Sequence, residues 1–534
     1  MKRKWIALLL TAAMTISMAA CGNDSGSGES ASGGGKENSE ADGGQAGDGG
    51  EAEGGGESAE GAGSGEAAAG EDPSQWPVVS IMYPVPNELP AEASVEKALN
   101  EYLVSINAGV QADIVQMNFG DLSTQLTLAL TDNTNPIDLF CWRFYSTVDG
   151  CVKNEQCISL EPYLEEYADM WATFPERVLM TQQIDGVQYA VPSVDSYGTY
   201  EVYMLRKDVA EDLGIADRDG EEITLEEMTQ IMKDAKAIHP EYAYMINTND
   251  DPVQGLDSLG NGDWLGVLLN RGVGTNEIVN YYETEEFRDY CHLMKEWNEA
   301  GLLCDDPLNN SMTIEQYNNG VAAGCYVGGY SADYIKALVS YSDESVQYKL
   351  TDLVGTSASV LGGWMISSIC KNPDAAMKML YLMTMDENVA RFIILGVEGE
   401  TYTVDEKGIA RYPEGIDSKT STWNLTFPWY WPNQCLSLPL ETEFTGYYTD
   451  MLDAPNHAQF SNAMGFVFDS ASVYDQMAAC TTVVAEYRPA LLYGLVDVDE
   501  YLEKFNQELK DAGIDDIIAE EQRQFDEFLA GLED

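Results

Sequence analysis

Short apolar runs alternate with helical stripes in the first part of the chain. The runs favour buried strands, and the stripes favour helices because their apolar positions recur three and four residues apart. Pro84 closes the first run, and Ser94 is placed to cap the helix that follows. The runs and stripes occupy residues 78–83, 95–106, 110–117, 122–130 and 137–142. This alternation of strand and helix is typical of a parallel α/β sheet.

The same alternation starts again later in the chain and then gives way to helices. The second set comprises helices at 226–238 and 286–300 and strands at 243–246 and 322–327. Further helices are expected at 373–385, 387–395, 499–511 and 515–529, with Gly513 as a C-cap between the last two. A folded part of this length exceeds the size at which a single core keeps growing. We therefore expect an α/β protein with two lobes.

The N-terminus carries a targeting signal and then a segment without core-forming residues. A basic cluster at residues 2–4 precedes an apolar run, which predicts a secretory signal over 1–20. The residues MAAC (18–21) resemble a bacterial lipobox, which implies that Cys21 is lipidated; an ordinary signal peptide with a chance cysteine is the alternative. Residues 21–73 then read as this cysteine plus a disordered, acidic, glycine-rich tether.

Charge and cysteine content narrow the possible partners. The formal net charge is −62, and the tether between residues 22 and 72 holds 13 acidic residues and one basic residue. This balance argues against nucleic acid and against direct binding to an anionic membrane surface, and it disfavours an anionic ligand. Of the other cysteines, Cys151 and Cys157 are close enough in sequence for a disulfide, and most are interpreted as small buried apolar residues. The sequence alone does not decide whether these two thiols are oxidised to a disulfide.

An ordered series of short motifs resembles a known family. The motifs are NPIDL (135–139), ISLEPYL (158–164), DGVQYAVP (185–192), GGWMIS (362–367), KNPDAA (371–376), GVEGETY (396–402), AGIDDII (512–518) and EQRQ (521–524). In this order they are similar to extracellular solute-binding proteins of sugar ABC importers, in the lipoprotein branch whose C-terminal domain has no assigned function.

The resemblance implies a two-lobed, periplasmic-binding-protein-like fold with a hinge and an inter-lobe cleft. One lobe would comprise residues 76–192 with 356–396, and the other 193–355 with 397–534, including a helical C-terminal extension. It further implies a monomer on the extracytoplasmic face of the cell membrane that binds an oligosaccharide, needs no cofactor or metal, catalyses no reaction, and contacts ABC importer permease subunits.

Candidate ligand-binding residues follow from strand ends and from sugar chemistry. Open parallel sheets bind ligands beyond the carboxyl ends of their strands, and sugars need aromatic platforms with a few polar partners. Trp364, which follows two glycines, is the strongest candidate. For each aromatic residue, the alternative is that its side chain packs in the hydrophobic core. The candidates are Tyr83, Trp142, Arg143, Tyr145, Asp195, Tyr197, Trp264, Tyr330, Trp364 and Trp423, with the remainder of the segment to residue 431.

Enzymatic motifs are absent from the sequence. His239, His292 and His457 have no metal-spacing partner, and neither GxSxG nor a P-loop occurs. The sequence DRDG (217–220) lacks the later ligands of a calcium loop and reads as a turn. With 90 acidic residues, a carboxylate pair at glycosidase separation would arise by chance. A tethered surface glycosidase or glycan-binding adhesin therefore remains the alternative to an importer receptor.

Overall fold

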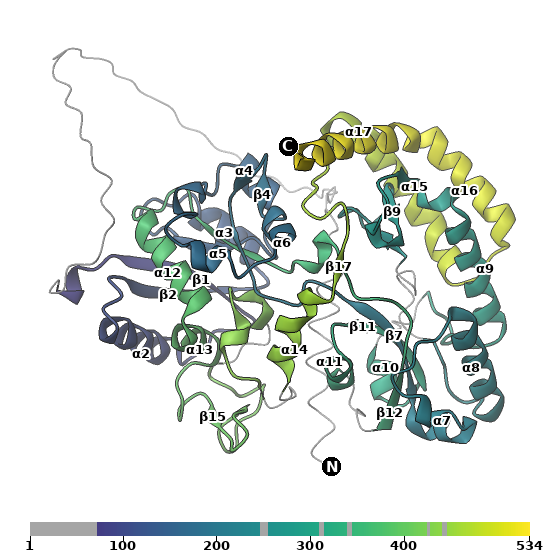
Figure 1. Cartoon of the computed structure of the whole chain (residues 1–534), viewed down its shortest axis with the longest axis horizontal. Coiled ribbons are helices and arrows are strands. Elements are labelled where there is room, and N and C mark those ends of the chain that lie inside the picture. Colours follow the sequence, from purple (N-terminus) through teal and green to yellow (C-terminus); the bar gives the residue numbers. More distant parts are fainter. Residues whose placement is uncertain are drawn as a thin grey trace, which may run out of the picture.

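The chain forms two lobes joined by a hinge (Figure 1). The computed structural model describes residues 72–245, 255–308, 314–338, 344–423, 428–440 and 446–533. The signal segment, Cys21 and almost all of the tether lie outside these residues. Within them, no helix combines the length and apolarity required to cross a bilayer.

The first lobe is built on a five-stranded mixed sheet in the order β2-β1-β3-β14-β6. Strands β1, β2 and β3 are parallel, and β14 runs antiparallel to β3 and β6. The strands are β1 (Val78–Val85), β2 (Gln111–Asn118), β3 (Leu139–Cys141), β6 (Val191–Pro192) and β14 (Gly363–Ile366). Two small hairpins pair β4 (Gln183–Ile184) with β5 (Val187–Gln188) and β15 (Thr403–Val404) with β16 (Ala410–Arg411).

Seven helices of the described residues belong to this lobe. They are α2 (Glu92–Ser105), α3 (Leu122–Ala129), α4 (Val148–Lys153), α5 (Ala168–Trp171), α6 (Glu176–Met180), α12 (Pro373–Met385) and α13 (Glu387–Leu395). Helices α2, α3, α12 and α13 lie at predicted places, whereas α4, α5 and α6 were not predicted. The predicted cap was wrong, because α2 begins before Ser94, whose hydroxyl instead donates to the Ala91 carbonyl at 2.8 Å. Cys151 and Cys157 are buried free thiols, so the disulfide that their spacing allowed is not formed.

The core of the first lobe extends further along the chain than expected. Tyr402, Trp423, Trp431 and Met464 belong to it, although the sequence had placed residues 397–534 in the second lobe. The reason is aromatic packing: the ring of Tyr83 on β1 lies 4.5 Å from that of Trp423 and 4.7 Å from that of Trp431. The chain therefore stays in the first lobe after α13 instead of passing to the second.

The second lobe contains two antiparallel sheets, of order β11-β7-β12 and β10-β9-β8. The strands are β7 (Tyr200–Arg206), β8 (Leu256–Asp257), β9 (Val267–Leu269), β10 (Ile278–Val279), β11 (Gly324–Gly329) and β12 (Ser345–Lys349). The helices are α7 (Lys207–Leu213), α8 (Leu225–Ile238), α9 (Glu285–Glu299), α10 (Ile314–Asn318) and α11 (Ala332–Ala337). Side-chain caps fix the starts of two of them, since Thr224 forms a capping box with Glu227 and Thr284 accepts from the Phe287 amide.

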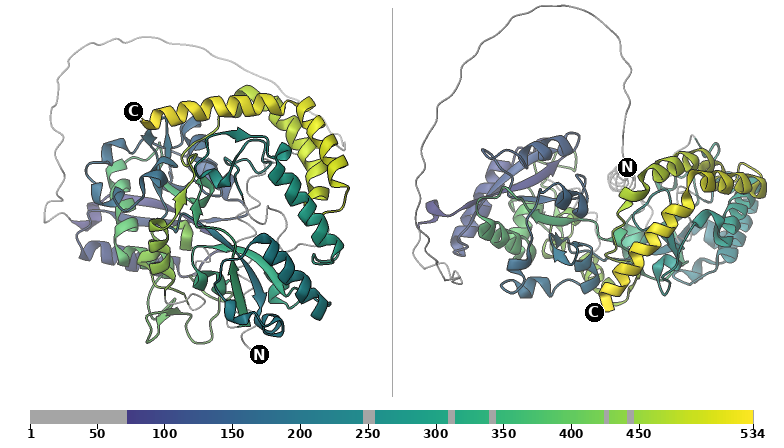
Figure 2. Two further views of the ribbon diagram at one scale, coloured as in Figure 1. Left: turned by 45° about the vertical axis from the view of Figure 1, so that its right-hand side comes forward. Right: turned by 90° about the horizontal axis from the view of Figure 1, so that it is seen from above.

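Three more helices complete the second lobe. They are α15 (Tyr474–Leu492), α16 (Val498–Ala512) and α17 (Ile514–Glu533). Gly513, at φ 99°, ends α16 in the left-handed conformation that the sequence predicted for a C-cap. From these helices α17 extends toward the first lobe, and the C-terminus lies at the border between the lobes (Figures 1 and 2).

The chain crosses between the lobes three times. Thr199 and Val354 exchange backbone hydrogen bonds at 3.0 Å, which joins the first crossing to the second. Strands β13 (Val354–Gly355) and β17 (Gln459–Phe460) pair in parallel and join the second crossing to the third. Helix α14 (Tyr447–Asp453) precedes the third crossing. The hinge is therefore a small sheet between the lobes, where Figure 1 labels β17.

Candidate functional site

The parallel strands of the first lobe end beside the hinge. The Trp142 amide, just after β3, donates to the Gly363 carbonyl at 3.1 Å, and the Ser193 amide, at the start of the first crossing, donates to the Gly362 carbonyl at 3.1 Å. Segments that follow the carboxyl ends of β2 and β3 therefore lie next to the part of the chain that links the lobes. Ligands bind at this edge in open α/β sheets.

Three half-buried aromatic residues, which we call the aromatic edge, gather here: Phe119, Phe144 and Trp429. The ring of Phe144 lies 5.5 Å from that of Phe119, edge to face, and 5.7 Å from that of Trp429. Phe144 has a φ of 66°, which is uncommon for a bulky residue and concentrates at functional sites. Phe119 was missed in the sequence, although it lies two residues after the second predicted strand, where the strand-end rule applies.

Behind the aromatic edge lies a row of fully buried aromatic residues. The ring of Phe144 stacks on that of Tyr430 at 6.1 Å, Tyr430 meets Trp364 at 5.7 Å, and Trp364 stacks on Trp431 at 5.1 Å. The Trp364 indole is 0% exposed and donates to the Tyr430 carbonyl at 2.9 Å. Trp364 is therefore a core residue in this structure, because β14 is an interior strand covered on both faces.

Two other aromatic candidates belong to the same core. Tyr83 and Trp423 are 1% and 2% exposed, and both donate to the Ile393 carbonyl, at 2.9 and 3.2 Å. The sequence left open that each aromatic candidate could instead be a core residue. The structure shows that Tyr83 and Trp423 are core residues. Their position behind the aromatic edge lets them support it without touching solvent.

The candidates that follow β3 lie at the aromatic edge. The Arg143 guanidinium sits 5.7 Å from the centre of the Phe144 ring. The Trp142 indole donates to the Gln182 side chain at 2.8 Å, and the Tyr145 hydroxyl accepts from the Gln156 amide. All three residues are half-buried, so they combine a fixed position with an accessible surface.

Asp195 and Tyr197 lie within the first crossing rather than on its surface. The Asp195 carboxylate is 8% exposed and accepts from the Ser196 amide at 2.6 Å and from the Gln434 side chain at 3.3 Å. Burial raises the pKa of Asp195 to about 6. The Tyr197 hydroxyl donates to the Ser193 carbonyl at 2.9 Å. Both side chains therefore stabilise the hinge in this structure.

The two candidates of the second lobe do not lie together. Tyr330 follows β11 beside the hinge, and its ring stacks on that of Tyr334 at 4.4 Å, with Tyr447 edge-on at 6.1 Å. Trp264 is 6% exposed, packs edge to face on Tyr281 at 5.7 Å and is covered by the Arg488 guanidinium of α15 at 4.7 Å. Trp264 is thus interior to the second lobe, whereas Tyr330, 8% exposed, is buried beside the hinge against Met451 of α14 and Ala454.

A cavity of about 640 Å³ lies elsewhere, between α17 and β10. Its lining combines the carboxylates of Glu277, Glu283 and Asp515 with apolar residues such as Ile518, and it contains no aromatic ring. This cavity lies within one lobe and offers no stacking surface. The aromatic edge, which has stacking surfaces and adjoins the hinge, is the better candidate for a sugar site.

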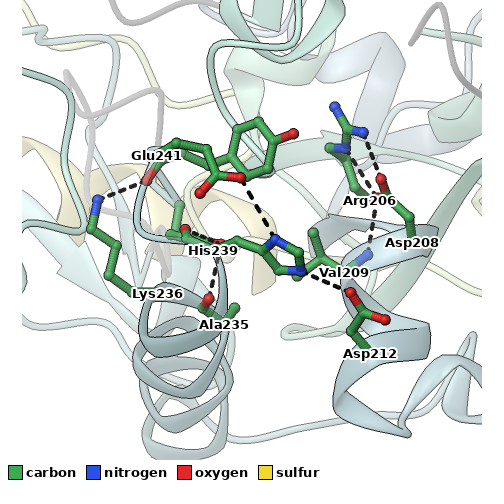
Figure 3. Close-up of polar contacts among 10 residues, drawn as sticks. Arg206, Asp208, Val209, Asp212, Ala235, Lys236, His239 and Glu241 are labelled. Atoms are coloured by element: carbon green, nitrogen blue, oxygen red, sulfur yellow. Dashed lines mark hydrogen bonds and ion pairs between the residues drawn. The ribbon is translucent and has the colours of Figure 1, made fainter.

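The three histidines lie beside exposed carboxylates. The His239 ring lies 2.9 Å from an Asp212 oxygen and 3.6 Å from a Glu241 oxygen (Figure 3). Both carboxylates are more than half exposed, so this arrangement is an ordinary solvated cluster. In the part of the chain that the structure describes, no group of three or more His, Cys, Asp or Glu side chains could hold a metal ion.

Family comparisons agree with this geometry. Residues 87–390 match the model for bacterial extracellular solute-binding proteins, and residues 462–530 match a domain of unknown function, DUF3502. The chain belongs to the bacterial extracellular solute-binding proteins. It is therefore an extracellular binding protein rather than an enzyme. Helices α15, α16 and most of α17 lie in the second matched segment, the domain of unknown function.

Individual relatives resemble this solute-binding protein over most of its length. A carbohydrate ABC transporter substrate-binding protein of Streptococcus pneumoniae is 22% identical over 449 residues, 81% of this chain and 88% of the relative. In fold the chain is similar to the N-glycan transport solute binding protein NgtS of S. pneumoniae, with 17% identity, 85% and 99% of the two chains covered and a TM-score of 0.69. An HMO binding ABC-transporter associated solute binding protein of Bifidobacterium longum infantis gives 15% identity, 85% and 99% coverage and a TM-score of 0.56. These similarities confirm the predicted α/β solute-binding fold.

Proposed function

We propose that this solute-binding protein captures an extracellular oligosaccharide at the aromatic edge and delivers it to the permease subunits of an ABC importer. The observation that carries the proposal is the group of half-buried rings of Phe119, Phe144 and Trp429 beside the hinge. The relatives named as carbohydrate and N-glycan binding proteins support the same ligand class.

The chemistry of the edge favours a neutral sugar chain. Sugar rings present apolar C–H faces that stack on aromatic rings, and their hydroxyl groups require a few polar partners. Arg143, next to the Phe144 ring, supplies donors, while the net charge of −62 disfavours an anionic glycan. Several separate rings suit several sugar units better than a single monosaccharide.

Closure of the lobes would complete the site. Tyr330 and Tyr334 of the second lobe follow β11 next to the hinge, and both rings pack against Tyr447 of α14. Hinge motion in two-lobed binding proteins brings the two faces together around a ligand. We expect the tyrosine pair to contact the sugar only in the closed arrangement.

A thermal-shift screen against neutral monosaccharides, oligosaccharides and peptides tests the proposal. A ligand that binds the folded state stabilises it by RT ln(1 + [L]/Kd), so neutral oligosaccharides should raise the melting temperature most. Chromatography after long incubation should recover the sugar intact. Shifts with peptides alone would overturn the ligand class, and shortened products would favour the tethered glycosidase.

We also propose that Cys21 is acylated and anchors the protein to the cell membrane. Two acyl chains can hold a soluble domain at a bilayer, at about 0.8 kcal/mol for each buried methylene. Cys21→Ala should therefore abolish incorporation of a fatty-acid analogue and release the protein or leave it unprocessed. Equal labelling of variant and wild type would contradict the anchor.

A further inference from the structure

One buried arginine of the second lobe holds two of the three hinge crossings. Arg271 lies in the short turn after β9 and is 8% exposed. Its guanidinium donates to the Thr199 carbonyl at 3.1 Å and hydroxyl at 3.0 Å, and to the carbonyls of Asp352 at 3.3 Å and Val354 at 3.2 Å. Its φ of 53° is uncommon for a side-chain-bearing residue, which indicates that this conformation is held by its surroundings.

The next residue holds the third crossing. The Gly272 carbonyl accepts from the Asn462 amide at 2.9 Å. Gly272 has a φ of 76°, and a Cβ at this position would collide with the Ser461 side chain, so a glycine is required. A turn of two residues thus bonds to all three chain segments that link the lobes.

The C-terminal domain fixes the sheet that carries this turn. Gln522 of α17 accepts from the Ile278 amide at 2.7 Å and donates to the Asn276 carbonyl at 3.0 Å, which pairs the outer edge of β10. The Asn462 side chain donates to the Asn276 side chain at 2.7 Å. The outer strand of the sheet is therefore tied both to α17 and to the third crossing.

Apolar packing strengthens the same connection. Phe525 of α17 is fully buried in one cluster with Leu268 of β9 and Ile278 of β10. The ring of Phe466, just after the third crossing, lies 5.2 Å from that of Phe525, whereas Met464, two residues earlier, lies in the core of the first lobe. The start of the C-terminal domain thus packs on both lobes.

We infer that the C-terminal domain, residues 462–530, is a brace for the hinge, and that it acts through Arg271 to set how the two lobes open and close. The brace contains none of the residues proposed to bind the sugar. Its role rests on the proposed function in one respect, namely that closure of the lobes retains the ligand. The domain of unknown function would then adjust affinity without touching the ligand.

The brace limits where the hinge can rotate. Arg271 and Gly272 hold the second-lobe ends of the crossings, so rotation must occur on the side of the first lobe. The first two crossings have suitable residues there: Tyr197 at φ 52° followed by Gly198, and Gly355. Hinges of this kind concentrate large backbone changes in a few such residues.

Hydrogen exchange on the ligand-free, full-length protein tests this inference. Arg271→Gln removes the donors that join the crossings, and Gln522→Ala removes the link from α17 while leaving the turn intact. The matched control is Arg206→Gln at the other end of β7, where the guanidinium pairs with Asp208 at 2.6 Å and has no hinge partner (Figure 3).

We expect exchange in peptides covering 194–202, 350–358 and 456–464 to rise about tenfold in Arg271→Gln, and less in Gln522→Ala, because local opening free energies fall where bonds are lost. The sheet of β1 and β2 should stay protected, and small-angle scattering should show a broader range of inter-lobe distances in both variants and not in the control.

Two results would overturn the inference. One is a folded Arg271→Gln protein whose hinge peptides exchange as in the wild type; the other is uniform acceleration of all peptides in both hinge variants, which would mean that these residues only stabilise the fold. Because no ligand is present, either result stands apart from the outcome of the sugar screen.

Discussion

The two lobes reach the hinge in different ways. The first lobe presents the carboxyl ends of parallel strands, with half-buried aromatic rings backed by buried ones. The second lobe presents antiparallel strands, a stacked tyrosine pair and a buried arginine tied to the C-terminal helices. The first lobe is therefore suited to bind the ligand, and the second to control the motion that encloses it.

The comparison also shows that aromatic residues of one type divide into two roles by burial. In the first lobe, Trp364 is fully buried, while Trp429 is half-buried at the same cluster. Truncating a buried ring leaves a cavity in the core, whereas truncating an edge ring removes contact area for a ligand. Variants of the two tryptophans should therefore separate folding from binding.

The largest effect is expected from Trp364→Ala. Loss of this ring leaves a cavity between Trp431 and Tyr430, so the free energy of unfolding should fall by about 3–5 kcal/mol in urea denaturation. Trp429→Ala is the matched control, with a much smaller change. Equal losses in both variants would remove the distinction between core and edge.

In the second lobe the corresponding prediction concerns the protonation of a buried carboxyl group, that of Glu521. Burial, together with the neighbouring Asp257 carboxylate, raises the pKa of Glu521 on α17 to about 8 from its ordinary 4.5. Burial also raises the pKa of Asp257, which accepts from the Leu259 amide and lies near the Arg271 guanidinium. The folded protein thus holds a proton on Glu521 that the unfolded chain releases.

This proton contributes stability that is complete below pH 4.5 and lost as the pH rises to about 8. Glu521→Gln should remove that loss. The free energy of unfolding of the variant should therefore rise relative to that of the wild type by up to about 1.4 kcal/mol per pH unit between pH 5 and 8. Glu520→Gln on the same helix is the control, since bonding to Arg523 lowers the pKa of Glu520 to about 2. Urea unfolding at several pH values checks both, and parallel profiles for Glu521→Gln and wild type would contradict the buried proton.

A smaller effect, on affinity alone, is expected from Trp429→Ala. Loss of a stacking ring should raise the Kd for the oligosaccharide at least about tenfold, or 1.4 kcal/mol, in isothermal titration. Tyr474→Ala, which truncates a ring that is 63% exposed on α15, should leave the Kd unchanged. An unchanged Kd for Trp429→Ala would move the ligand away from the aromatic edge.

Much of the fold followed from local patterns in the sequence. The three parallel strands of the first lobe and its helices α2, α3, α12 and α13 were predicted from their apolar patterns, and α16 and α17 from their apolar stripes and Gly513. Helix α15 was missed, although its buried residues Cys480, Val484, Tyr487 and Leu491 recur three and four apart, because apolar residues outside this stripe and Pro489 near its end obscure the pattern. Strand β7 was also missed, although it is the centre of its sheet.

The site was harder to predict, because burial depends on distant segments. Trp364 lies in the interior strand β14, where Trp431 stacks on it and also contacts Tyr83, whereas Trp429 belongs to a segment more than 60 positions further along the chain. The strand-end rule selected Trp142, Arg143 and Tyr145, which follow β3 and are half-buried, and their contact with a ligand stays a prediction. The hinge contacts of Arg271 join residues more than 70 positions apart, which no local pattern encodes.

A crystal structure with the best oligosaccharide from the thermal-shift screen tests the central claim most directly. We predict closed lobes with sugar rings stacked on Phe119, Phe144 and Trp429, at ring separations of about 4–5 Å. Electron density for the sugar in the cavity between α17 and β10, with the aromatic edge unoccupied, would contradict it.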